Sequence, residues 1–354
     1  MKKISTILMA LLAGSQIFAQ TVSYSVVDKN PDNYKKTALS IDVFDADICT
    51  GITMGMAAKL ETQVASFIPW LQYKYNYVDG NASKNVDIMP VGGLNKTKHL
   101  EVGATWFFRD NNSELPVDVV LHSTSTSSTS RGITTTTTYS KYIQVPSLIK
   151  KMTGVDFGYT RSSRCLELDH SLGEDDWQNP DWKYSTPDGS VTLPVFDPGS
   201  APDNVVYPDG SYWMPGTNYT VNTLFFGLRS RKVVNTIINA EGWGKRANRS
   251  ITDLYFHLMY APEAKLETMT DLKGREWTLV PANSKMNRNL GWKVGLNYKR
   301  FNFFQATAEL GYKPGPKIKA KGMFDNGFYL GLGFGFFLGT KHSFMSTYSG
   351  EAMQ

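Results

Sequence analysis

One stretch near the C-terminus restricts the folds open to this chain more than any other. Residues 327–338 read Gly-Phe-Tyr-Leu-Gly-Leu-Gly-Phe-Gly-Phe-Phe-Leu. Because successive side chains of a β-strand point to opposite faces, a strand here has one continuous apolar face and a second face that is mostly glycine. The apolar face needs a second protein layer or lipid, and about ten residues suffice for a tilted membrane-spanning strand. Its members are Phe328, Leu330, Leu332, Phe334, Phe336 and Leu338.

The N-terminus predicts export. Lys2 and Lys3 precede an apolar run at 4–12 and a small-residue stretch ending at Ala19, which is the order of a cleaved signal peptide over residues 1–19. The apolar run is too short for a spanning helix, and no later stretch reaches about 18 continuous apolar residues. We therefore expect an exported protein that is periplasmic, secreted or inserted as a barrel.

Composition favours the barrel. The chain has 18 Tyr, 19 Phe and 8 Trp, yet its overall hydropathy is slightly negative. Barrels show this mixture because only alternate residues meet lipid, although a secreted β-sandwich shares it. Two cysteines, Cys49 and Cys165, are too few for a disulfide framework and are compatible with one bridge or two free thiols.

Alternating strands fill residues 37–340. The pattern is clearest at 290–299 and 304–312, where large apolar side chains alternate with polar residues and glycine. We predict an all-β fold, a transmembrane antiparallel up-and-down barrel of about twelve strands, with ten or fourteen as alternatives. A lead-in at 20–36 and a tail at 341–354 flank it. Turns are expected at 110–113 and 143–154, and either a short amphipathic helix or a hairpin at 232–249.

The lengths of the connections also follow the barrel pattern. If the N-terminus is periplasmic, the long segments fall outside the cell and the short turns inside, as in bacterial barrels. The predicted outer segments are 80–97, a Ser/Thr hairpin around 123–138, 165–218, 262–287 and 314–326. The connection at 232–249 is a long inner exception. A disordered loop is the alternative for the Ser/Thr segment.

The segment 165–218 differs from the rest of the chain. It has seven of the sixteen prolines and ten acidic residues against one lysine. Exposed aromatic residues are typical interface anchors, so partner binding or occlusion of the lumen by an inward-folded constriction is favoured. Calcium binding is a weaker alternative, because no regular ligand spacing appears. The candidate partner-binding residues are Trp177, Trp182, Tyr184, Tyr207, Tyr212 and Trp213.

Charged residues also occur at positions whose strand parity points into the lumen. They either line a pore that favours anions or pair with one another and fill the barrel, and the pattern does not choose between the two. The lumen candidates are Lys74, Glu101, Arg109, Asp118, Arg229, His257, Lys293, Lys299 and Glu309.

No pattern indicates catalysis or a cofactor. Asp169 and His170 are adjacent, but no nucleophile or acid is spaced to complete a catalytic set. Phosphate-binding loops, Cys/His metal spacing and a concentrated basic patch are absent from the sequence, so we expect no enzyme activity, no cofactor, no bound metal and no nucleic-acid partner.

The signal that ends at Ile17-Phe18-Ala19-Gln20, the aromatic alternating strands and the Gly/Phe-rich closing strand together resemble outer-membrane β-barrel proteins of the Bacteroidota type. The tail after Phe337 departs from the usual terminal aromatic residue. The resemblance implies a location in the bacterial outer membrane, in contact with lipid. We expect a structural or accessory subunit that docks onto a larger outer-membrane complex through its extracellular loops. The alternative is a porin-like channel for small hydrophilic solutes, with a bias toward anions.

Overall fold

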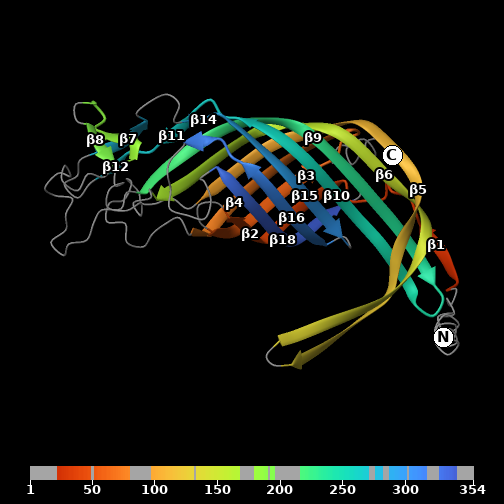
Figure 1. Cartoon of the computed structure of the whole chain (residues 1–354). Coiled ribbons are helices and arrows are strands. Elements are labelled where there is room, and N and C mark those ends of the chain that lie inside the picture. Colours follow the sequence, from red (N-terminus) through yellow and green to blue (C-terminus); the bar gives the residue numbers. More distant parts are fainter. Residues whose placement is uncertain are drawn as a thin grey trace, which may run out of the picture.

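The computed structural model of the chain describes residues 22–48, 52–79, 97–130, 133–167, 179–189, 192–195, 216–270, 276–281, 287–300, 303–316 and 327–340. Within these ranges, ten strands form a ring (Figure 1). In chain order they are β2 (Thr37–Ile48), β3 (Ile52–Thr62), β4 (Phe67–Asp79), β5 (Lys98–Ser130), β6 (Ile133–Glu167), β9 (Gly216–Ala240), β10 (Gly244–Tyr260), β15 (Leu290–Arg300), β16 (Phe304–Tyr312) and β18 (Phe328–Thr340).

Each strand of the ring pairs antiparallel with the next one along the chain, and β18 pairs with β2 to close it. Two short strands, β1 (Tyr24–Asp28) and β11 (Ala264–Leu266), add to β9 and complete a twelve-stranded sheet. The prediction of an all-β, up-and-down antiparallel barrel built on about twelve strands is confirmed, with ten of the strands in the ring.

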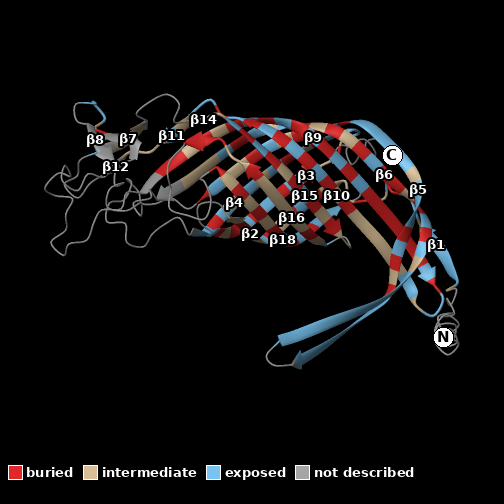
Figure 2. Ribbon diagram, viewed as in Figure 1, coloured by how far each residue is buried: buried red, intermediate tan, exposed pale blue. Residues whose placement is uncertain are grey.

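Alternation along each strand separates an inner from an outer surface. On β18, Phe336 and Leu338 are exposed on the outside, whereas Tyr329 and Phe337 are buried inside. Figure 2 shows the resulting alternation of buried and exposed positions over the barrel wall. The glycines of β18 leave room for neighbouring groups, since a Cβ at Gly333 would lie 2.2 Å from the Thr307 hydroxyl.

Two strands are much longer than predicted. Residues 110–113 and 143–154 are not turns but continue β5 and β6, which pair from Lys98–Ser163 to Ser130–Ile133. Polar residues are tolerated there because both strands extend beyond the barrel wall. The Ser/Thr hairpin therefore projects from the end of the barrel at which β1 lies (Figure 1). The prediction that it shares the end of the long loops was wrong.

The segment 232–249 is the hairpin of β9 and β10, which turns at residues 241–243. Its apparent helical spacing arises because both faces of β9 are covered. Val233, Val234, Ile237 and Ile238 are all buried. Beyond the Ile149–Val234 pair, the β5–β6 ribbon separates from β9. The two ribbons then pack on each other through a small core of Val119, Leu121, Val145, Ile238 and Ala240.

At the opposite end of the barrel lie small sheets made by the long connections (Figure 1). One has the order β12 (Met269–Thr270), β13 (Glu276–Pro281), β7 (Asn179–Ser185) and β8 (Thr192–Val195), and the other pairs β14 (Asn287–Arg288) with β17 (Gly315–Pro316). The expected signal peptide and the tail at 341–354 lie outside the described residues. A helix long and apolar enough to cross a membrane is not found in the described part of the chain.

Candidate functional site: the barrel lumen

Seven of the nine lumen candidates lie on the inner surface of the ring. They come from six strands. Each occupies a position that points inward, because alternate residues of a barrel strand face the lumen. Five of them, among them Arg229, His257 and Lys299, are buried. Lys74 and Glu309 are slightly more accessible, with 21% and 16% of their side chains exposed. The seven are Lys74, Glu101, Arg229, His257, Lys293, Lys299 and Glu309.

The middle of the lumen contains a network of buried ion pairs. The guanidinium of Arg229 donates to Asp156 at 2.8 Å, and the ring of His257 lies 2.7 Å from the same carboxylate. Beside them, Arg231 donates to Asp253 at 2.6 Å. A buried carboxylate or guanidinium is costly unless paired, so this arrangement satisfies charges that water would otherwise solvate.

The network continues to Lys299 and Glu61. The ammonium group of Lys299 donates to Glu61 at 2.5 Å, and the Arg231 guanidinium lies 3.7 Å from the same carboxylate. The acidic partners Asp156, Asp253 and Glu61 were not among the predicted residues, and neither was Arg231. Their inward strand parity was a usable signal. Their pairing was not visible, because it depends on strands far apart in sequence.

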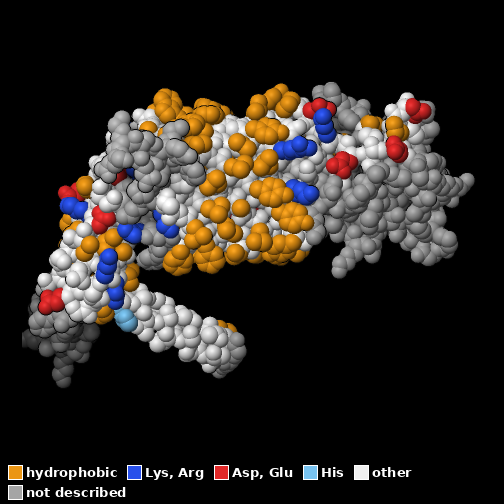
Figure 3. Space-filling view, turned by 180° about the vertical axis from the view of Figure 1, so that it is seen from behind, with side chains coloured by type: hydrophobic (Ala, Val, Ile, Leu, Met, Phe, Trp, Pro, Cys, Tyr) orange, Lys and Arg blue, Asp and Glu red, His pale blue; other side chains and the backbone are white. Residues whose placement is uncertain are grey.

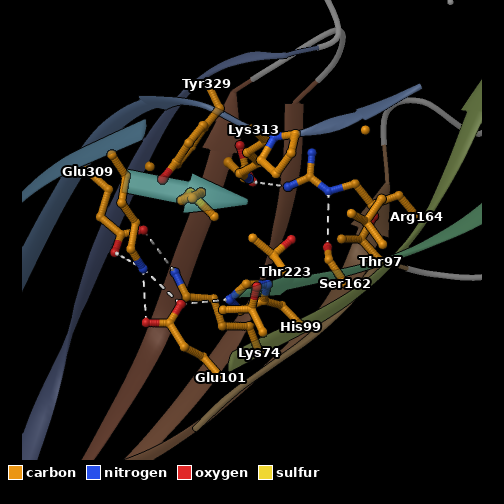
Figure 4. Close-up of a pocket in the computed structure, with 18 of the residues that line it drawn as sticks. Lys74, Thr97, His99, Glu101, Ser162, Arg164, Thr223, Glu309, Lys313 and Tyr329 are labelled. Carbon is orange, nitrogen blue, oxygen red and sulfur yellow. Dashed lines mark hydrogen bonds and ion pairs between the residues drawn. The ribbon is translucent and has the colours of Figure 1, made fainter. Parts of the chain in front are cut away.

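A second cluster lies toward the end with the long connections (Figure 4). Lys293 donates to Glu101 at 2.8 Å, and His99 lies 3.1 Å from that carboxylate. Lys74 donates to Asp45 at 3.0 Å and lies 3.8 Å from Glu309. These residues, with Asp47, Arg164 and Lys313, surround a cavity of about 60 Å³. It has room for only a few water molecules.

Aromatic side chains fill the space between the two charged clusters. The rings of Trp70 and Phe225 stack with centroids 5.8 Å apart, and Phe225 stacks on His257 at 4.7 Å. Met259 packs in the same buried cluster as Trp70 and Phe225. The ammonium of Lys59 lies 4.8 Å from the Trp70 ring. The middle of the barrel is thus packed with side chains.

The N-terminal segment crosses the other end of the lumen. Tyr34 is buried in a cluster with residues from five strands of the ring, namely Ile68, Phe107, Met152, Val233 and Ile251. Its hydroxyl donates to Gln63. Burial raises the pKa of Tyr34 to about 12, since the charged phenolate loses its hydration.

Polar contacts anchor the same segment at the rim. Lys150 donates to Asp32 at 2.6 Å and lies 2.7 Å from Asp110. Burial lowers the pKa of Lys150, but the hydrogen bonds to these two carboxylates outweigh it and the net direction is upward. Asn235 donates to Asp28 at 3.0 Å. The segment that was predicted as a lead-in, residues 20–36, is therefore anchored to the end of the barrel through its described residues.

Arg109 and Asp118 do not belong to the lumen. Arg109 follows a β-bulge at 107–109, where the wall of the barrel ends, and its side chain is exposed. Asp118 lies in the extension beyond the wall and is also exposed. Both were placed in the lumen because β5 was expected to end at residues 110–113.

The loop candidates are only partly located. Trp182 and Tyr184 belong to the backbone of β7, while Trp177, Tyr207, Tyr212 and Trp213 lie outside the described residues. Cys49 lies outside them as well. In the part of the chain that the structure describes, no group of three or more His, Cys, Asp or Glu side chains is arranged to hold a metal ion.

Comparison with known proteins gives little. No protein family and no curated protein matches the chain. Among solved structures, it is similar to one described as a bacterial polysaccharide outer membrane secretin, with 10% identity over 86% of this chain and 99% of that chain and a TM-score of 0.20. It is also similar to OmpT, an outer membrane protein of Vibrio cholerae, with 9% identity over 88% of this chain and 99% of that chain and a TM-score of 0.21.

These matches amount to a weak resemblance to outer-membrane β-barrel proteins. Scores this low carry no argument about function, and nothing in them supports the Bacteroidota type that was expected from the sequence. The chain is an all-β antiparallel barrel with a paired, largely filled interior.

Proposed function

We propose that the protein is an integral outer-membrane β-barrel with a closed lumen, which serves as a structural or accessory subunit of a larger outer-membrane assembly. The filled lumen is the observation that carries this proposal. Ion pairs join opposite walls of the barrel, as between Lys293 and Glu101, and the segment around Tyr34 crosses one end. A solute path would require breaking several buried charge pairs at once, each of which is costly to separate.

The outer surface supports insertion in a membrane. Large apolar side chains are exposed on the outside of the ring strands, and Figure 3 shows the band that they form on one face of the wall. Aromatic residues border this band at both of its ends, as in membrane barrels. Toward the long connections they are Tyr75, Tyr77, Tyr159, Tyr260 and Trp292, and toward the short turns they are Phe67, Trp106, Phe108, Phe303 and Phe336, all of them exposed.

The lengths of the connections indicate which end of the barrel faces out of the cell. With the Ser/Thr hairpin at the end of the short turns, every turn there is brief: residues 63–66, 131–132, 241–243 and 301–303. The connections at the other end, except for residues 49–51, are long. Bacterial barrels have their long loops outside the cell, so the acidic aromatic segment 165–218 is extracellular in this proposal and is the element that docks onto a partner.

Single-channel conductance in planar bilayers tests the closed lumen. We expect the refolded protein to give no steady conductance, and a variant without residues 28–36 to remain silent as well, because the central ion pairs do not depend on that segment. Steady conductance of the intact protein would overturn the proposal in favour of the porin-like alternative.

Crosslinking in the native membrane tests the accessory role. We expect a neighbouring outer-membrane protein to be crosslinked to the intact chain but not to a variant that lacks residues 168–215. Deletion of residues 125–138, which lie at the opposite end, is the matched control and is expected to leave that crosslink unchanged. If the intact chain crosslinks to no other protein, the docking role is contradicted. That result would not affect the closed lumen, which the conductance experiment tests separately.

A further inference from the structure

The Ser/Thr arm, defined as residues 123–130 of β5 and 133–140 of β6, is a two-stranded ribbon that projects from the barrel (Figure 1). Its described side chains are exposed and none of them is charged. The ribbon leaves the packed part of the extension where Trp243 contacts His122, with ring centroids 5.8 Å apart. Beyond that contact, no other part of the described chain covers it.

One face of the arm is held together by its own hydroxyl groups. Four cross-strand pairs lie 2.9–3.0 Å apart: Ser123–Ser140, Ser125–Thr138, Ser127–Thr136 and Thr129–Thr134. Each pair uses one O–H donor and leaves the other hydroxyl's donor free. The four pairs join the two strands of the arm along this face.

The backbone of the arm also has unpaired groups along its edge. From Ile133 to Leu148, the edge of β6 that faces away from β5 pairs with no other described strand, since β9 joins β6 only from Ile149 onward. The neighbouring ribbon differs, because β1 covers the edge of β9 at residues 237–240. Exposed edges are normally protected by Lys, Pro or a bulge. Residues 133–140 contain none of these.

We propose that this edge pairs antiparallel with the same edge of a second copy of the chain, which forms a four-stranded sheet around a two-fold axis centred on Thr136. In this register Thr134 lies opposite Thr138, and Ile133 lies opposite Tyr139. Both Ile133 and Tyr139 are unusually exposed, at 70% and 68%. An aromatic residue opposite a β-branched residue is a favourable cross-strand pair.

The composition of the edge suits pairing with itself. A neutral strand meets no like charge in its copy, and threonine has a high strand propensity. The ribbon already forms Ser–Thr and Thr–Thr pairs within the chain. A second copy repeats that chemistry and satisfies the open backbone groups of both copies. The inference does not depend on whether the lumen conducts.

Matched lysine variants test the proposal. The purified full chain in detergent is expected to show a concentration-dependent dimer in analytical ultracentrifugation. The variant T134K/T138K places two pairs of lysines opposite each other in the dimer and is expected to raise the dissociation constant about tenfold or more. The control S125K/T129K removes the same two hydroxyl pairs and adds the same charge on β5. It is expected to dimerise like the wild type.

Cysteine crosslinking tests the register. In a background with Cys49 and Cys165 replaced by Ser, a mixture of Ile133→Cys and Tyr139→Cys chains is expected to form disulfide-linked dimers, while each variant alone does not. Thr136→Cys alone is expected to crosslink to itself, because opposed Cα atoms in antiparallel strands lie within disulfide range. A wild-type chain that stays monomeric, or lysine variants that behave alike, would overturn the proposal.

Discussion

At the scale of single residues, the interior of the barrel depends on reciprocal charge pairing. Asp156 is the partner of both Arg229 and His257 and is fully buried. The sequence predicted that Arg229 and His257 point inward, since this follows from strand parity alone. It did not predict Asp156, because recognising the pair requires knowing that β6 and β9 are neighbours although their residues are 73 positions apart.

Asp156→Ala is expected to lower the free energy of unfolding by about 3–5 kcal/mol, because it removes the nearest counter-charge of the buried Arg229 guanidinium and leaves only Asp253 at 3.6 Å. Urea unfolding followed by tryptophan fluorescence measures the change. Glu114→Ala is the control, since its pair with Lys29 is exposed at 57% and 47%. This substitution is expected to change stability by less than about 1 kcal/mol. Equal effects of the two would contradict a structural role for the lumen network.

At the scale of elements, the outward and inward faces of β18, β15 and β16 could be read directly from the sequence. The extent of β5 and β6 could not. Asp110, Asn111 and Asn112 have turn-forming side chains, but turn residues are indistinguishable from strand residues where a sheet projects into water and both faces are solvated. The boundary error then moved Arg109 and Asp118 into the lumen and the Ser/Thr hairpin to the wrong end.

The N-terminal segment yields a prediction about pH. The pKa of Tyr34 is about 12 in the folded protein and near 10 when the segment is exposed. Because the folded state favours the protonated phenol, the contribution of Tyr34 to the free energy of unfolding is fully present below about pH 10 and is lost as the pH rises toward 12. Urea midpoints from pH 9 to 12 are expected to fall more steeply for the wild type than for Tyr34→Phe. Parallel curves would show that Tyr34 is not buried.

At the scale of the whole molecule, the outer apolar band predicts sensitivity to charge at a depth set by the membrane. Phe256→Arg places a charge near the middle of the band on β10 and is expected to cost about 2–4 kcal/mol in lipid. Thr252→Arg, on the same face of β10 at the next outward-facing position beyond Leu254, is nearer the end of the band and is expected to cost about 0–1 kcal/mol. Unfolding from lipid vesicles gives both values. Similar costs would contradict the proposed membrane position.

The seam between β18 and β2 has a consequence for how the molecule is made. It joins Thr340 to Thr37, so the first and last strands of the ring are partners. Pairings between such distant residues form late, because closing the long intervening loop reduces the entropy of the chain before the new strand pairing can stabilise it. The ring therefore cannot close until β18 has been delivered. Until that moment the charged groups of the interior remain hydrated on an open sheet, and closure is the step at which their water is expelled.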